Sequence, residues 1–187
     1  MNILCFSDRC CLSEDEASKV LDVVSTLLTF LRRHSTKIDN AIHTAMRDLE
    51  AARNAMYRVV GGIRALRSRF KNLRSFDELT DVESVVNTVV NVLNRLVEVR
   101  NLIQRVRDEA ESSGLSDVVQ YVDSHVPMLD GVIIKASLIG LRIALNLPKV
   151  SRDDSGKLAS AIGTAFFASL LSLHEDVFRK YVDGCLD

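Results

Sequence analysis

Tryptophan is absent from this sequence, proline occurs only twice, and glycine accounts for 8 of the 187 residues. These few turn-forming residues exclude a collagen-like repeat and argue against a β-sandwich with many short strands. Hydrophobic residues make up 47% of the chain and charged residues 26%, which argues against an intrinsically disordered protein. A chain of this length can bury a core without disulfides. The composition therefore predicts an all-α protein built from long helices.

The motifs of common enzyme classes are also missing. The sequence has no glycine-rich phosphate loop followed by Lys and Ser/Thr, no Gly-x-Ser-x-Gly turn and no His-Glu-x-x-His pair. Its four histidines are scattered, and His174-Glu175 lacks the Glu-x-x-His spacing of a di-iron bundle. We therefore expect a protein that is not an enzyme and has no catalytic residue, cofactor, bound metal or small-molecule substrate.

The cysteines occur only near the two ends of the chain. They are Cys5, Cys10, Cys11 and Cys185. This spacing, with no histidine nearby in sequence, is a poor match to a zinc site. The apolar run at the N-terminus is broken by Asp8 and Arg9, so we expect no signal peptide and an intracellular location. Free thiols are the first expectation, and a disulfide between the two ends or a metal site remains an open alternative.

A heptad pattern of apolar residues covers the first part of the chain. Ser13 and Glu16 form a capping box, which predicts that a helix begins there. Apolar positions then alternate in steps of four and three, interrupted once at Ser35, and this period of 3.5 predicts coiled-coil-like packing of a long helix. The positions are Leu21, Val24, Leu28, Leu31, Ile38, Ile42, Ala45, Leu49, Ala52, Met56, Val59, Ile63, Leu66, Phe70 and Leu73.

A second pattern of the same kind follows and predicts the other arm of an antiparallel helical hairpin. Its members are Val82, Val85, Val89, Val92, Leu96, Val99, Ile103, Val106 and Ala110. Two places could hold the tip of the hairpin. Gly61-Gly62 is costly inside a helix, whereas the turn-like stretch from Ser75 to Thr80 would leave the first pattern unbroken.

Shorter elements are expected after the hairpin. Helices are predicted from Ser116 to His125, from Pro127 to about Leu147, and from Lys157 to Asp183, with a polar linker at 151–156. The uncharged run Leu158 to Leu173 is too short to span a membrane and predicts a buried helix. The chain thus divides into an N-terminal cysteine-containing segment (1–12), a helical body (13–150), and a linker with an apolar C-terminal helix (151–187).

Positive charge is concentrated in one block of the sequence. From Arg32 to Arg74 there are eleven basic residues against three acidic ones, although the net charge of the whole chain is -1. Such a surface attracts acidic lipid headgroups or nucleic-acid phosphates, or it pairs with acidic surfaces of the later helices, in its own chain or in a neighbour. Tyr57 and Phe70 are the only aromatic residues in the block, which disfavours nucleic acid. The candidate polyanion-binding residues are Arg47, Arg53, Arg58, Arg64, Arg67, Arg69, Lys71 and Arg74.

Two local stretches resemble the ESCRT-III family, in particular its archaeal cell-division members. Arg32-Arg33 followed by Lys37-Ile38-Asp39-Asn40-Ala41-Ile42 is similar to the basic stretch in that family's first helix. Glu98-Val99-Arg100-Asn101-Leu102 is similar to a stretch in its second helix. The resemblance covers roughly residues 13 to 125 and aligns Gly61-Gly62 with the family's hairpin turn.

The resemblance implies a filament-forming subunit that remodels membranes and binds acidic lipid through Arg47 to Arg74. We therefore expect either an ESCRT-III-like hairpin or a helical bundle. The expected protein self-assembles and lies in the cytoplasm at an acidic membrane surface. The alternative is a helical-bundle adaptor whose basic helix binds a protein partner, with nucleic acid as the less favoured ligand.

Overall fold

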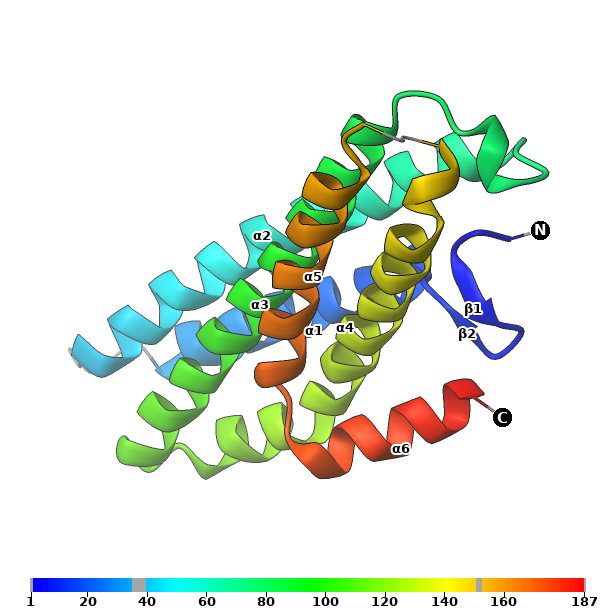
Figure 1. Cartoon of the computed structure of the whole chain (residues 1–187). Helices are drawn as coiled ribbons and strands as arrows, with labels where there is room; N and C mark the ends of the chain where they lie inside the picture. Colours follow the sequence, from blue (N-terminus) through cyan, green and yellow to red (C-terminus); the bar gives the residue numbers. More distant parts are fainter. Residues whose placement is uncertain (1, 35–39, 151–152, 187) are drawn as a thin grey trace.

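A computed structural model describes residues 2–34, 40–150 and 153–186 of the chain (Figure 1). The fold is all-α, as predicted, apart from a small antiparallel hairpin of β1 (Cys5–Ser7) and β2 (Cys10–Cys11) at the N-terminus. The helices are α1 (Glu14–His34), α2 (Asn40–Phe70), α3 (Val82–Ser112), α4 (Ser116–Val150), α5 (Ser155–Leu171) and α6 (Glu175–Leu186). A 3-10 turn, η1 (Phe76–Glu78), lies between α2 and α3.

The first four helices form a closed bundle. Each packs against the next in sequence, and α4 returns to pack against α1. Helix α5 lies on the outside of this bundle, along α3 and α4, and α6 turns back toward the N-terminal hairpin (Figure 1). Because α5 covers the side formed by α3 and α4, the outer surface of α2 is left open to solvent.

Most positions of the two predicted apolar patterns are confirmed as core positions, whereas Leu21, Leu73 and Val82 are only half-buried. In α2 every member from Ile42 to Phe70 is buried, and in α3 every member from Val85 to Ala110 is buried. One half of the predicted capping box is present, because the backbone N–H of Glu16 donates to Ser13 Oγ at 3.4 Å, while the Glu16 carboxylate accepts from Lys135. These residues pack against one another within a single chain, so the core of the bundle needs no second copy.

The prediction of a single long first helix is wrong, because the chain forms two helices, α1 and α2, that pack side by side. The expected member Ile38 lies outside the described residues. The apolar register resumes in the same phase after the interruption, so periodicity alone does not distinguish one long helix from two short ones.

The tip of the hairpin lies at the second of the two predicted places. Helix α2 continues through Gly61 and Gly62 and ends at Phe70, and α3 begins at Val82. Phe76 and Leu79 are buried under the intervening turn, which anchors it to the bundle. Asp81 adopts a left-handed conformation (φ 55°) at the start of α3, so the chain reverses direction there.

The adjacent glycines of α2 face opposite environments, which makes them a matched pair for mutation. A Cβ at Gly62 would lie 2.6 Å from Cγ2 of Val92, whereas a Cβ at Gly61 would meet nothing within 4 Å. Gly61→Ala should raise the free energy of unfolding by roughly 0.5–1 kcal/mol, because alanine loses less backbone entropy. In urea denaturation, the free energy of unfolding of Gly62→Ala should be about 2 kcal/mol lower than that of Gly61→Ala, because the branched side chain of Val92 has little freedom to move away from the new Cβ. Equal stabilities would show that α2 and α3 are farther apart than described.

The predicted helix boundary at Pro127 is wrong, since α4 runs through Pro127 and Pro148 without a break. A proline inside a helix costs about 3 kcal/mol. The burial of Leu129, Val132 and Ile133 immediately afterwards offsets this cost.

The predicted single C-terminal helix is wrong as well, because it breaks between α5 and α6. Ser172 Oγ donates to the carbonyl of Ser169, and the N–H of Leu173 donates to Leu170, which closes α5 with tight turns. The expected burial of this segment holds for one face only. Leu158, Ile162 and Ala165 are buried, but Phe167 is 65% exposed and Leu171 is 87% exposed. Within the described part of the chain, no helix is both long and apolar enough to cross a membrane.

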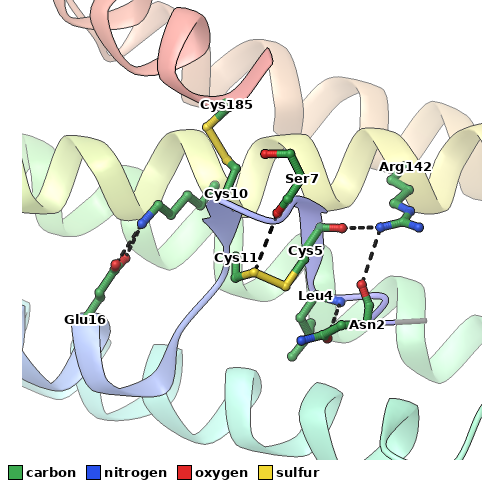
Figure 2. Close-up of a disulfide and its surroundings, with 10 residues drawn as sticks. Asn2, Leu4, Cys5, Ser7, Cys10, Cys11, Glu16, Arg142 and Cys185 are labelled. Atoms are coloured by element: carbon green, nitrogen blue, oxygen red, sulfur yellow. Dashed lines mark hydrogen bonds and ion pairs between the residues drawn. A yellow bond between two sulfur atoms is a disulfide. The ribbon is translucent and has the colours of Figure 1, made fainter. Parts of the chain in front are cut away.

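The cysteines form two disulfides, so the expectation of free thiols is wrong (Figure 2). Cys5 pairs with Cys11 inside the β-hairpin, and Cys10 pairs with Cys185 on α6. The second bond is the predicted alternative that joins the two ends of the chain. Free thiols were expected because disulfides are rare in intracellular proteins, but the fold places these four residues within bonding reach.

Candidate anion-binding surface

The eight basic residues singled out from the sequence lie on α2 and in the turn that follows it. Seven of them are exposed and Arg53 is half-buried. The apolar residues of α2 face the core in a continuous stripe, so the arginines between them point outward. The fold therefore gathers these cations on one outer side of the bundle, which we call the α2 basic face, comprising Arg47, Arg53, Arg58, Arg64, Arg67, Arg69, Lys71 and Arg74.

Acidic residues of neighbouring helices neutralise part of the α2 basic face. Arg64 donates to Glu14 of α1 at 2.7 and 2.8 Å, and Arg67 lies 3.7 Å from the same carboxylate. Arg69 pairs with Asp81 at 3.1 Å. Part of the positive charge of α2 is therefore neutralised within the same chain, as the alternative interpretation predicts.

The remaining cations of the face have no such neutralising contact. Among the residues that the structure describes, no acidic side chain lies within ion-pair distance of Arg47, Arg53, Arg58, Lys71 or Arg74. The two acidic residues of α2 are themselves paired, Asp48 with Arg105 at 2.8 Å and Glu50 with Arg32 at 3.9 Å. The face therefore keeps a positive charge that an external anion can meet.

A groove of ≈ 250 Å³ crosses the edge of this face between α2 and α3. Arg58 and Gly62 line it from α2, and Thr88, Asn91, Val92 and Arg95 line it from α3. Arg95 was missed as a site residue in the sequence analysis. It is distant in sequence from the basic block, and only the packing register of α2 against α3 brings it opposite Arg58.

A second charged cluster lies inside the bundle. Arg100 of α3 donates to Asp130 of α4 at 2.8 Å, and only 7% of Arg100 and 1% of Asp130 are exposed. Burial raises the pKa of Asp130, and the positive charge of Arg100 counteracts only part of that rise. Since Asp130 lies in the interior, this pair is part of the core and not a surface open to ligands.

Helix α6 covers the bundle next to this buried pair. Tyr181 donates through its hydroxyl to the carbonyl of Pro127 at 2.8 Å and packs over Gly131. Burial raises the pKa of Tyr181, with Asp130 and Glu16 adding to the effect. Lys135 of α4 donates to both carboxylate oxygens of Glu16 at 2.7 and 2.8 Å.

Metal-ligating side chains do not gather anywhere in the described ranges, where no three His, Cys, Asp or Glu residues are placed to hold an ion. The histidines have ordinary contacts: His34 lies 3.2 Å from Asp117, and His125 stacks on Tyr121. The arrangement of charged groups that stands out on the described surface is thus the α2 basic face with its groove.

Comparison with known proteins adds no relative. No family model, no curated protein and no solved structure matches this chain.

Proposed function

We propose that the protein is a non-enzymatic helical bundle that binds an acidic membrane surface through the α2 basic face. The observation that carries the proposal is the row of exposed cations along the outer side of α2. The side chains of Arg47, Arg58, Lys71 and Arg74 make no ion pair among the described residues, although the carboxylate of Glu78 accepts the backbone N–H of Arg74 at 2.9 Å. A basic residue near an anionic lipid surface contributes about 1 kcal/mol. Four such residues suffice for measurable, salt-sensitive binding.

The resemblance to ESCRT-III supports the same ligand, because that family acts at acidic membranes. In this chain, however, α2 is continuous through Gly61 and Gly62, and the hairpin turn comes later. The apolar residues of both patterns are also packed inside the bundle, so a filament would have to assemble through other surfaces. The two disulfides are typical of an oxidising compartment or of a hyperthermophile, and we place the acidic surface in one of these settings.

A vesicle-binding experiment tests the proposal. The variant Arg47→Ala/Lys71→Ala/Arg74→Ala removes three exposed cations from the α2 basic face. We expect it to bind vesicles containing phosphatidylserine roughly 100-fold more weakly than the wild type, corresponding to about 3 kcal/mol. Co-sedimentation at low and near-physiological salt measures the loss.

The matched control is Lys149→Ala/Lys157→Ala/Lys180→Ala, which removes three exposed cations from α4, α5 and α6. It should retain most of the binding, because these residues lie on other elements. Equal losses in the two variants would show that net charge alone governs binding. A wild-type protein that ignores acidic vesicles at both salt concentrations would contradict the proposal.

A protein adaptor is the second candidate, and one observation favours it. On α5, Phe167 and Leu171 are largely exposed, and no charged residue occurs between Leu158 and Leu173. Exposed apolar surface of this kind is common at protein–protein interfaces. Phe167→Ser/Leu171→Ser should leave vesicle binding unchanged if the α2 basic face acts alone.

A further inference from the structure

The groove between α2 and α3 exists because Gly62 lacks a side chain. Its neighbour across the groove is Val92, whose Cγ2 would lie 2.6 Å from a Cβ at this position. The two helices can approach closely only because of this glycine, and the longer side chains on either side rise around the contact. The result is a hollow lined by Gly62 and Val92 together with the polar side chains of Arg58, Thr88, Asn91 and Arg95.

The walls of the groove carry hydrogen-bond donors and two arginines, of which Arg58 makes no ion pair among the described residues and Arg95 pairs with Glu98 at 2.8 Å. Arg58 stands on α2, and Arg95 and Asn91 stand on α3 one turn apart. Arg95 uses Nη1 to hold Glu98 at 2.8 Å, so its guanidinium retains further N–H groups for a ligand. Thr88 donates its hydroxyl proton to the carbonyl of Ser84 at 2.8 Å and can therefore only accept.

No acidic side chain lines this groove. Arginine forks match the paired oxygens of a phosphate group, and two of them facing one hollow favour a dianion over a monoanion. At ≈ 250 Å³ the groove is smaller than the pockets that enclose drug-sized ligands, which run from about 300 to 1,000 Å³. It therefore suits a terminal phosphate and not a whole nucleotide.

We infer that the groove formed by Arg58, Gly62, Asn91 and Arg95 binds a terminal phosphate group, either the phosphate monoester of some lipid headgroups or inorganic phosphate. The inference rests on the proposed membrane binding, because it assigns one headgroup chemistry to one end of the α2 basic face. The rest of that face supplies attraction to any acidic surface, and the groove adds preference for the terminal phosphate.

The test compares two kinds of vesicle with matched surface potential, one containing phosphatidic acid and the other phosphatidylserine. Only phosphatidic acid presents a terminal phosphate. We expect the wild type to bind phosphatidic acid vesicles at least tenfold more tightly. Arg95→Gln should reduce the ratio of the two affinities to about one. Its loss of binding to phosphatidylserine should be at most about fivefold, the value for one cation near an acidic membrane.

The matched control is Arg47→Gln/Lys71→Gln, which removes two exposed cations of the face that make no ion pair among the described residues and do not line the groove. It should weaken binding to both vesicles and leave the preference intact. If Arg95→Gln keeps the preference for phosphatidic acid, or if the wild type shows no preference, the inference that the groove binds phosphate is wrong. The proposed membrane binding would still stand if both acidic vesicles bound better than neutral ones.

Titration with inorganic phosphate separates a lipid source from free phosphate. Amide chemical shifts of Gly62 and Asn91 should move in the wild type and stay fixed in Arg95→Gln. Should no vesicle bind, the proposed function fails. In that case, the inferred phosphate site is supported, with free phosphate as its ligand, if these chemical shifts change. The inference is wrong if they do not change.

Discussion

Removing the Cys10–Cys185 bond should lower the free energy of unfolding by roughly 5 kcal/mol, the larger of the two disulfide effects. The bond joins residues 175 positions apart. In the chain-entropy description, a cross-link stabilises by restricting the unfolded chain, which gives about 5 kcal/mol for a loop of this length and about 2 kcal/mol for a loop of six residues. Guanidinium denaturation of Cys10→Ala/Cys185→Ala should show the larger loss, and Cys5→Ala/Cys11→Ala the smaller one.

The native contacts around the bond point in the same direction. Cys10 and Cys185 are buried with Ile134 and Leu138 of α4, and Val177, Tyr181 and Val182 of α6 pack around them. Without the bond, α6 is still held by this small apolar contact and by the hydrogen bond from Tyr181. Equal stabilities for the two double variants, or no change on reduction of the wild type, would contradict the described pairing.

The cysteine pairing also shows where sequence reasoning stops. Four cysteines allow three pairings, and nothing in their spacing selects one. By contrast, every pattern position of α2 from Ile42 to Phe70 and of α3 from Val85 to Ala110 is buried as predicted. The pattern missed further buried apolar residues between them, namely Ala55, Val60, Val86, Leu93 and Leu102. The reason is that burial on a helix leaves a periodic trace in the sequence, whereas contacts between the chain ends leave none.

The candidate site divides in the same way. The α2 basic face was predictable, because its residues are close in sequence and fall between core positions. Arg95 was not, because its place opposite Arg58 depends on the register of α3 against α2, which Gly62 sets by allowing close approach. Helix boundaries at prolines failed for a related reason, since tertiary packing of α4 outweighs the local cost of Pro127.

The second large effect is expected at the buried pair of Arg100 and Asp130. Asp130→Ala should lower the free energy of unfolding by about 3–5 kcal/mol, because it leaves the guanidinium of Arg100 charged and buried without its partner. The surface pair of Arg179 and Glu175 is the control, with side chains 72% and 75% exposed and a distance of 2.6 Å. Glu175→Ala should cost less than about 1 kcal/mol. Urea denaturation of both variants makes the comparison.

Replacing both members of the pair separates the cost of an unpaired charge from the value of the bond. Burial raises the pKa of Asp130 in spite of Arg100, so the charged carboxylate loses more by desolvation than the ion pair returns. Arg100→Met/Asp130→Leu should therefore recover most of the stability lost in Asp130→Ala. A double variant as unstable as the single one would show that the pair itself stabilises the bundle.

The pH dependence of the same variants gives an independent check. A carboxyl whose pKa is higher in the folded than in the unfolded chain binds its proton more readily when folded, so protonation favours folding. Relative to Arg100→Met/Asp130→Leu, the wild type should gain stability as the pH falls through the raised pKa of Asp130. The gain should be complete below pH 3.8, because 3.8 is the ordinary pKa of an aspartate side chain. A relative loss of stability over that interval would mean that Arg100 lowers the pKa of Asp130 more than burial raises it.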